Sequence, residues 1–275
     1  MATQTIVQSL AYISWALLLV LALGSFSLAH LLRQVTDVTT GFVGFTASTA
    51  SALALLAWLT DGGLPYPDHL NIHAAPGLDG GRGMVLAAFT ALAALSALRY
   101  YRGHRARWLG PLAILAGVSA LALGALGWAS GDQMGLPLLV ELLSLAAVSG
   151  GSLAAVILAH WYLVTPRLSE RPLVLTTQFL MVAIGVELLL FLVWQTVSTP
   201  DGRPFSTFTG PEALFVWLQL LVGLVFPLVL TYMAYRTALT RSMESATGLI
   251  YIELAAVLAS TIVVAGLAFA VGLLV

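Results

Sequence analysis

Eight apolar runs dominate this sequence, and each is long enough to cross a lipid bilayer. They cover roughly residues 10–33, 39–59, 83–100, 108–130, 136–164, 173–197, 212–235 and 248–275. About 20 apolar residues in a helix cross the roughly 30 Å of hydrocarbon in a bilayer. The runs are continuous and do not alternate with a period of two, which favours helices over barrel strands. The sequence therefore predicts an all-α polytopic membrane protein with eight transmembrane helices.

The composition agrees with a chain that has the lipid bilayer as its main partner. Only 8% of the residues are charged, 60% are hydrophobic, and the mean hydropathy is +0.98. The net charge of −1 gives no basis for nucleic-acid binding, so no nucleic-acid partner is expected. The absence of cysteine excludes disulfides, thiolate metal sites and iron–sulfur clusters.

The arginines predict how the helices are oriented. Alternating the loops between two sides places nine of the eleven basic residues on one side, and only Arg82 and Arg203 on the other. By the positive-inside rule the first side is cytoplasmic, so both termini lie outside the cytoplasm of a bacterial-type inner membrane. The opposite loops are acidic; they hold Asp61, Asp68, Asp79, Asp132, Asp201 and Glu212. That acidic face is interpreted as a docking surface for a periplasmic protein or for other membrane subunits.

Two segments indicate an internal repeat. "GSFSLAHLL" (24–32) in the first run resembles "GSLAAVILAHWYL" (151–163) in the fifth, and an arginine-containing turn follows each. Because a unit of four helices returns the chain to its starting side, the repeat would be parallel, with halves 1–131 and 132–275 in a single membrane domain. His30 and His160 then become candidate pseudo-symmetric partners.

The two histidines lead to a cofactor hypothesis. Each lies about one helical turn inside the arginine-rich end of its helix. If the first and fifth helices pack together, His30 and His160 are candidate axial ligands of the iron of a b-type haem. Arg33, Arg167 and Arg171 would then meet the haem propionates. The alternatives are an interfacial position without a ligand, beside the aromatic residues of the fifth run, and a role in proton transfer or substrate binding.

The sequence also favours close approach of the first and fifth runs. Gly24 and the run "SGGS" at 149–152 make the two helices thin at similar depth. Small residues of this kind accommodate either a bulky cofactor or a close helix crossing.

Three glutamates lie within apolar runs, where an ionisable group is a functional candidate by default. Glu141 lies near the outer end of the fifth run, Glu187 deep in the sixth, and Glu253 near the inner end of the eighth. Together they would form a stepped route for protons, which makes them the candidate catalytic residues. The alternative is that each is a neutral acid that hydrogen-bonds to a neighbouring helix.

Three functions remain open on sequence grounds. The first is an electron-transfer subunit that handles haem b or quinone through His30 and His160. The second is a proton-coupled carrier of a small solute with Glu187 as the coupling acid. The third is a non-catalytic scaffolding subunit of a membrane complex. The sequence contains no P-loop, HExxH or GxSxG motif.

Overall fold

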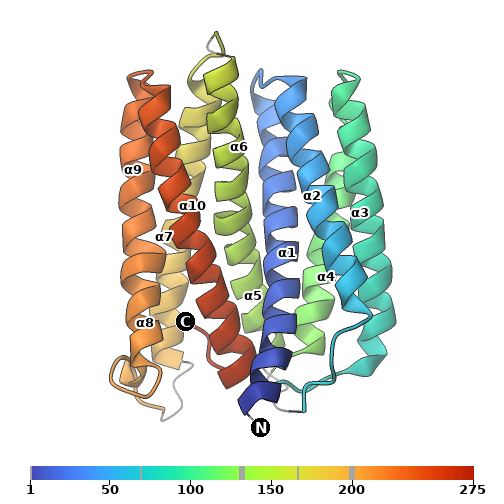
Figure 1. Ribbon diagram of the computed structural model, residues 1–275, viewed down its shortest axis with the longest axis vertical. Coiled ribbons are helices and arrows are strands. Elements are labelled where there is room, and N and C mark those ends of the chain that lie inside the picture. Colours follow the sequence, from blue (N-terminus) through green and yellow to red (C-terminus); the bar gives the residue numbers. More distant parts are fainter. Residues whose placement is uncertain (1, 69, 130–133, 166, 198–201) are drawn as a thin grey trace.

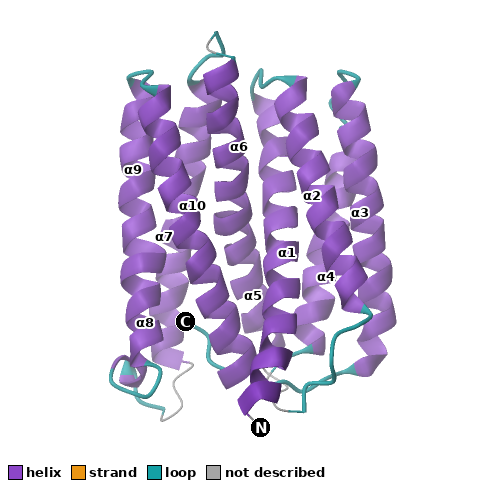
Figure 2. Cartoon of the chain, in the orientation of Figure 1, coloured by secondary structure: helices purple, strands orange, loops and turns teal. Residues whose placement is uncertain are grey.

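The computed structural model describes residues 2–68, 70–129, 134–165, 167–197 and 202–275, and within these ranges it contains helices and no strand (Figures 1 and 2). Among the described residues, eight helical spans are long and apolar enough to cross a membrane. They are Val7–Val35, Thr40–Asp61, Pro76–Tyr101, Leu109–Gly127, Gly135–Val164, Arg171–Val197, Ala213–Leu239 and Met243–Val271. The prediction of an all-α, eight-helix membrane protein is confirmed.

The first four spans are plain α-helices. They are α1 (Ala2–Val35), α2 (Thr40–Asp61), α3 (Asp79–Tyr101) and α4 (Leu109–Gly127), with a short 3₁₀ helix η1 (Pro76–Leu78) before α3. The Thr39 side chain caps α2 by accepting a hydrogen bond from the backbone N–H of Phe42. Each of these helices packs along the next one in the chain.

The last four spans are less regular, because three of them contain a π-helical segment. The fifth span is α5 (Gly135–Leu145), η2 (Ala146–Gly150) and α6 (Gly151–Val164), and the sixth is α7 (Arg171–Val197). After the 3₁₀ helix η3 (Ser206–Phe208), the seventh span is α8 (Ala213–Leu218), η4 (Gln219–Val225) and α9 (Phe226–Leu239). The eighth is α10 (Met243–Gly266) followed by η5 (Leu267–Val271).

Both termini lie in the same half of the bundle, and the end of the bundle in that half is here called the terminal end (Figure 1). The turns after α1, α3, α6 and α9 lie at the opposite end, here called the arginine-rich end (Figure 1). The relation of these ends to the two sides of a membrane stays a prediction. Asp132 and Asp201 of the predicted acidic face lie outside the described residues.

The first and fifth spans form the centre of the bundle. In each of them 72% of the residues in the most apolar stretch are buried, compared with 33% in α7. Their backbones touch: a side chain at Gly24 would collide with the carbonyl of Ala146, and a Cβ at Gly150 would lie 2.5 Å from Cα of Gly24. The small residues therefore serve a close helix crossing, and the packing on which the haem hypothesis depends is present.

The remaining helices arrange themselves around this centre as two groups. Helices α1 to α4 lie together, while α10 packs on α9 and α6, and α9 also packs on α7 (Figure 1). Helix α1 also packs on α6 and α10, and the predicted division into two four-helix halves stays a prediction, as does the internal repeat. The predicted boundary between the halves, after residue 131, lies outside the described residues.

Candidate functional site

Two buried carboxyl groups lie next to each other in the second half of the bundle. Glu141 comes from α5, about two turns after its start, and Glu187 from α7, about three turns before its end. Their exposed fractions are 1% and 2%, and their carboxyl groups are close enough to interact directly. The sequence predicts these residues as separate steps of a route, whereas the structure brings them together. We call Glu141 and Glu187 the acidic pair.

The acidic pair has few partners. The indole Nε1 of Trp194 donates a hydrogen bond of 2.6 Å to Oε2 of Glu141, and the hydroxyl of Ser144 approaches Glu187. Among the described residues, no donor is aligned as a full hydrogen bond with Oε1 of Glu141 or with either oxygen of Glu187. The described ion pairs, which involve Arg82 and Arg241, leave both carboxyls without a cation. The pair thus has unused hydrogen-bonding capacity inside the helix bundle.

Two π-helical segments place polar side chains against α10. Ser149 on η2 lies 2.5 Å from Thr261, hydroxyl to hydroxyl, and Gln219 on η4 accepts a 2.7 Å hydrogen bond from the hydroxyl of Ser260. Gly223 leaves room for the second contact, because a Cβ there would lie 2.6 Å from both Oε1 of Gln219 and Oγ of Ser260. Single-turn π segments are frequent at functional sites because the extra residue re-aims side chains. The sequence analysis noted Ser149 only as part of a small-residue run and missed Gln219, Ser260 and Thr261, although each is a polar side chain inside an apolar run.

Glu253 continues the polar side chains of α10 toward the arginine-rich end. It is fully buried, about two turns from Ser260, and its Oε1 accepts a 2.7 Å hydrogen bond from the hydroxyl of Ser152. Its Oε2 has no partner among the described residues. Thr247 lies further along the same helix and donates to the carbonyl of Ala159. We call the following set of buried side chains the polar row: Glu141, Glu187, Ser149, Gln219, Ser260, Thr261, Ser152, Glu253 and Thr247.

His30 lies inside the first half of the bundle. It is 4% exposed, and its Nδ1 lies 2.6 Å from the hydroxyl of Tyr100 on α3. A side chain at Gly110 on α4 would collide with the imidazole, and the ring of Phe26 is parallel to it. His30 is therefore enclosed by its own half of the bundle.

His160 has a different environment. It is exposed on α6, and its Nδ1 lies 3.5 Å from the hydroxyl of Tyr251 on α10. The two histidines share no partner, although their helices touch. Ligation of one haem by both therefore stays a prediction that this geometry does not favour. No group of three or more histidine, aspartate or glutamate side chains in the described part of the chain could hold a metal ion.

The three arginines proposed for haem propionates also have separate environments. Nη1 of Arg33 donates a 2.9 Å hydrogen bond to the carbonyl of Val38, which closes the turn between α1 and α2. Arg167 and Arg171 are exposed near the turn between α6 and α7. Arg33 thus supports a turn, and the other two lie on the surface of the arginine-rich end.

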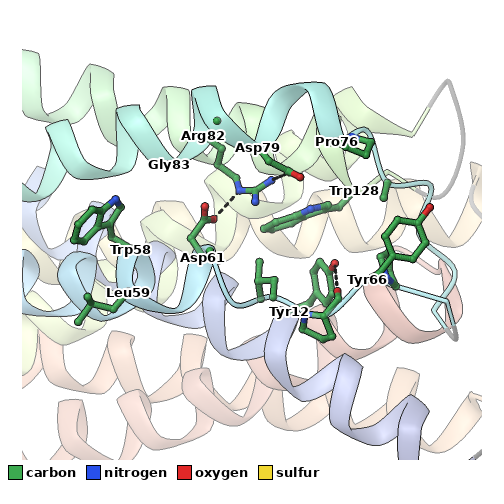
Figure 3. Close-up of a pocket in the computed structure, with 16 residues that line it drawn as sticks. Tyr12, Trp58, Leu59, Asp61, Tyr66, Pro76, Asp79, Arg82, Gly83 and Trp128 are labelled. Atoms are coloured by element: carbon green, nitrogen blue, oxygen red, sulfur yellow. Dashed lines mark hydrogen bonds and ion pairs between the residues drawn. The ribbon is translucent and has the colours of Figure 1, made fainter.

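The first half contains a buried acid that, unlike the acidic pair, is paired with a cation (Figure 3). Nε of Arg82 lies 2.7 Å from Oδ1 of Asp61, and its Nη1 lies 2.7 Å from Oδ1 of Asp79. The guanidinium also stacks 4.3 Å from the ring centroid of Trp128. These groups line a cavity of about 650 Å³ at the terminal end, together with the exposed ring of Tyr66. The sequence places Arg82 and Asp61 in an outer loop and does not predict that either is buried.

Searches against known proteins return nothing for this chain. No family model, no curated protein and no solved structure matches it. The two halves differ in their buried acids: Asp61 in the first half is neutralised by Arg82, whereas the described ion pairs leave the acidic pair in the second half without a cation. Such a pair can bind, hold and release protons.

Proposed function

We propose that this protein is a proton-coupled carrier of a small solute, and that the acidic pair is its protonation site. The observation that supports this proposal is that the buried carboxyl groups of Glu141 and Glu187 are close enough to interact, while the described ion pairs leave both without a neutralising cation. Two negative charges this close in a medium of low dielectric constant repel each other strongly. At least one carboxyl must hold a proton, or be met by a cation, whenever the site is closed to water.

The polar row supports a route from the acidic pair toward the arginine-rich end. Hydroxyl and amide groups can accept and donate hydrogen bonds in turn, so they can hold water or a polar solute between the two acidic positions. Glu253 provides a second protonation position beyond Ser149 and Thr261, next to the hydroxyl of Ser152. The buried acid of the first half differs from those of this row, because Arg82 neutralises Asp61.

The experiment that tests this proposal measures proton flux into proteoliposomes. The purified chain is reconstituted with a pH-sensitive dye inside, a potassium diffusion potential is imposed, and a panel of small polar solutes is added outside. We expect internal acidification that depends on the protein and on one class of solute. Glu187→Gln and Glu141→Gln should each reduce it at least about tenfold, because the amide keeps the size of the side chain but cannot exchange a proton.

The matched control is Glu244→Gln, which removes a carboxylate from an exposed position in the first turn of α10. Its flux should equal that of the unmodified protein. Equal flux in a Glu141→Gln/Glu187→Gln double variant would contradict the proposal. So would the absence of any flux above that of empty liposomes with every solute of the panel.

Electron transfer through haem b and a purely scaffolding role remain predictions from the sequence. An oxidised and a reduced absorption spectrum of the same preparation test the first. A haem band that disappears in both His30→Ala and His160→Ala would restore the haem hypothesis. Stability only within a larger membrane assembly would support the scaffolding role.

A further inference from the structure

A second site lies on the outer surface of the helix bundle, away from the acidic pair. It is a pocket of about 430 Å³ between α2, α6 and α10. Its lining residues are Phe45, Val156, Ile157, His160, Trp161, Val164 and Tyr251. The surface of a membrane-spanning helix at this position faces lipid, and the volume is in the range of small-molecule sites.

The pocket combines apolar walls with two polar groups. The rings of Phe45 and Trp161 lie 6.4 Å apart at their centroids and form one wall. His160 and Tyr251 provide the imidazole and the phenol, which lie 3.5 Å apart, at the outer limit of a hydrogen bond. Both side chains are exposed, so their remaining hydrogen-bonding capacity is directed to whatever fills the pocket.

A second histidine–tyrosine pair in the chain does not have this open hydrogen-bonding capacity. The His30 and Tyr100 pair is made of the same two residue types, but its Nδ1 to Oη distance is 2.6 Å and both residues are buried. The imidazole and the phenol of that pair therefore hydrogen-bond to each other inside the protein. The His160 and Tyr251 pair is exposed on the surface of two spans, so its hydrogen-bonding capacity is open to an external partner.

Depth and charge define the chemistry of that partner. His160 lies about one turn from the end of α6, and Tyr251 about two turns from the start of α10, so the polar groups lie near the arginine-rich ends of these two spans. No arginine, aspartate or glutamate lines the pocket. An uncharged head with oxygen acceptors complements this surface better than an anionic phosphate, which requires guanidinium or ammonium groups.

We propose that this pocket binds the head ring of a membrane-soluble quinone. The Tyr251 hydroxyl and an N–H of the His160 imidazole each donate a hydrogen bond to an oxygen atom of the quinone ring. The Trp161 and Phe45 rings contact the quinone ring, and the apolar tail lies in the lipid. The proposal concerns binding alone, and it does not depend on the acidic pair, so either proposal can fail without the other.

The test is a titration of the full chain in lipid nanodiscs with decylubiquinone. Tryptophan fluorescence should be quenched in a saturable manner, above the linear quenching caused by partition of the quinone into lipid. Tyr251→Phe and His160→Leu should each weaken the apparent affinity up to about tenfold, the effect of one lost hydrogen bond. A photoreactive azidoquinone should label peptides of α6 and α10.

Tyr100→Phe is the matched control, because it changes the buried histidine–tyrosine pair and leaves the pocket intact. Its quinone affinity should be that of the unmodified protein. Linear quenching alone in the unmodified protein would overturn the proposal, as would unchanged affinity in both pocket variants. A phospholipid that stays bound in native mass spectra and is not displaced by decylubiquinone would overturn it in favour of a lipid site.

Discussion

The indole nitrogen of Trp194 lies 2.6 Å from Oε2 of Glu141, and in the described part of the chain this is the one aligned hydrogen bond that the acidic pair accepts. Trp194 lies on α7, two turns from Glu187, so the helix that supplies one acid also supplies the donor that holds the other. Glu141 is thus fixed in place, while Glu187 keeps its oxygens free of aligned donors. This asymmetry makes Glu187 the member of the pair that exchanges the proton in our proposal.

Trp194→Phe should destabilise the bundle, because it removes the donor and leaves a buried carboxyl oxygen unsatisfied. The expected loss is about 1–3 kcal/mol in the free energy of unfolding. Denaturation of the purified protein by SDS, followed by circular dichroism, measures it. Trp217→Phe is the control, since its indole makes an exposed 3.3 Å hydrogen bond to the carbonyl of Phe208. Equal stability of the two variants would show that the Trp194 contact is unimportant.

Arg82→Met should destabilise the terminal end more strongly. It leaves Asp61, which is 8% exposed, without its cation, and removal of one partner from a buried ion pair costs about 3–5 kcal/mol. The same denaturation assay checks this. The double variant Arg82→Met/Asp61→Asn should recover part of the loss, because no unpaired buried charge remains. Arg203→Met, at an exposed position, should have no measurable effect.

The helical architecture could be predicted from the sequence because the bilayer imposes it. Runs of about 20 apolar residues have no other stable solution in hydrocarbon, and the structure has the eight spans that these runs predict. Gly24 and the small residues near Ser149 predicted either a close helix crossing or room for a bulky cofactor, and the two backbones touch there. The apolar length of each run and its small residues are local properties of the sequence, so one sequence is enough to see them.

The site could be predicted only in part, because it depends on which helix faces are in contact. Glu141, Glu187 and Glu253 stood out as polar residues in apolar runs, but depth along each run gave no information on lateral packing. The contact between Glu141 and Glu187 requires α5 and α7 to be neighbours. For the same reason the matched depth of His30 and His160 made them candidates for a shared ligand but gave no information on the helix faces; in the structure they lie beside Tyr100 and Tyr251 on different helices.

The crossing of the two central spans gives a third prediction. Gly24→Val should prevent the close approach of α1 and η2, because the added side chain would overlap the Ala146 carbonyl in a position where both helices are buried. We expect loss of the folded monomer, or a strong decrease in its thermal stability, measured by fluorescence-detected size-exclusion chromatography. Gly185→Ala is the control: nothing lies within 4 Å of a Cβ at Gly185, so this variant should be at least as stable as the parent. Normal folding of Gly24→Val would mean that the two spans do not cross here.

The two histidine–tyrosine pairs give the last prediction, which separates a structural pair from a surface pair. Tyr100→Phe leaves His30 buried without its 2.6 Å partner, so the free energy of unfolding should fall by about 1–3 kcal/mol. Tyr251→Phe breaks a 3.5 Å contact between exposed groups and should change stability by less than about 0.5 kcal/mol. Parallel SDS denaturation of the two variants measures the difference. If Tyr251→Phe were the more destabilising change, His160 would be a structural residue of the α6 and α10 interface, and the open hydrogen-bonding capacity of the lipid-facing pocket would have to be explained by something other than a ligand.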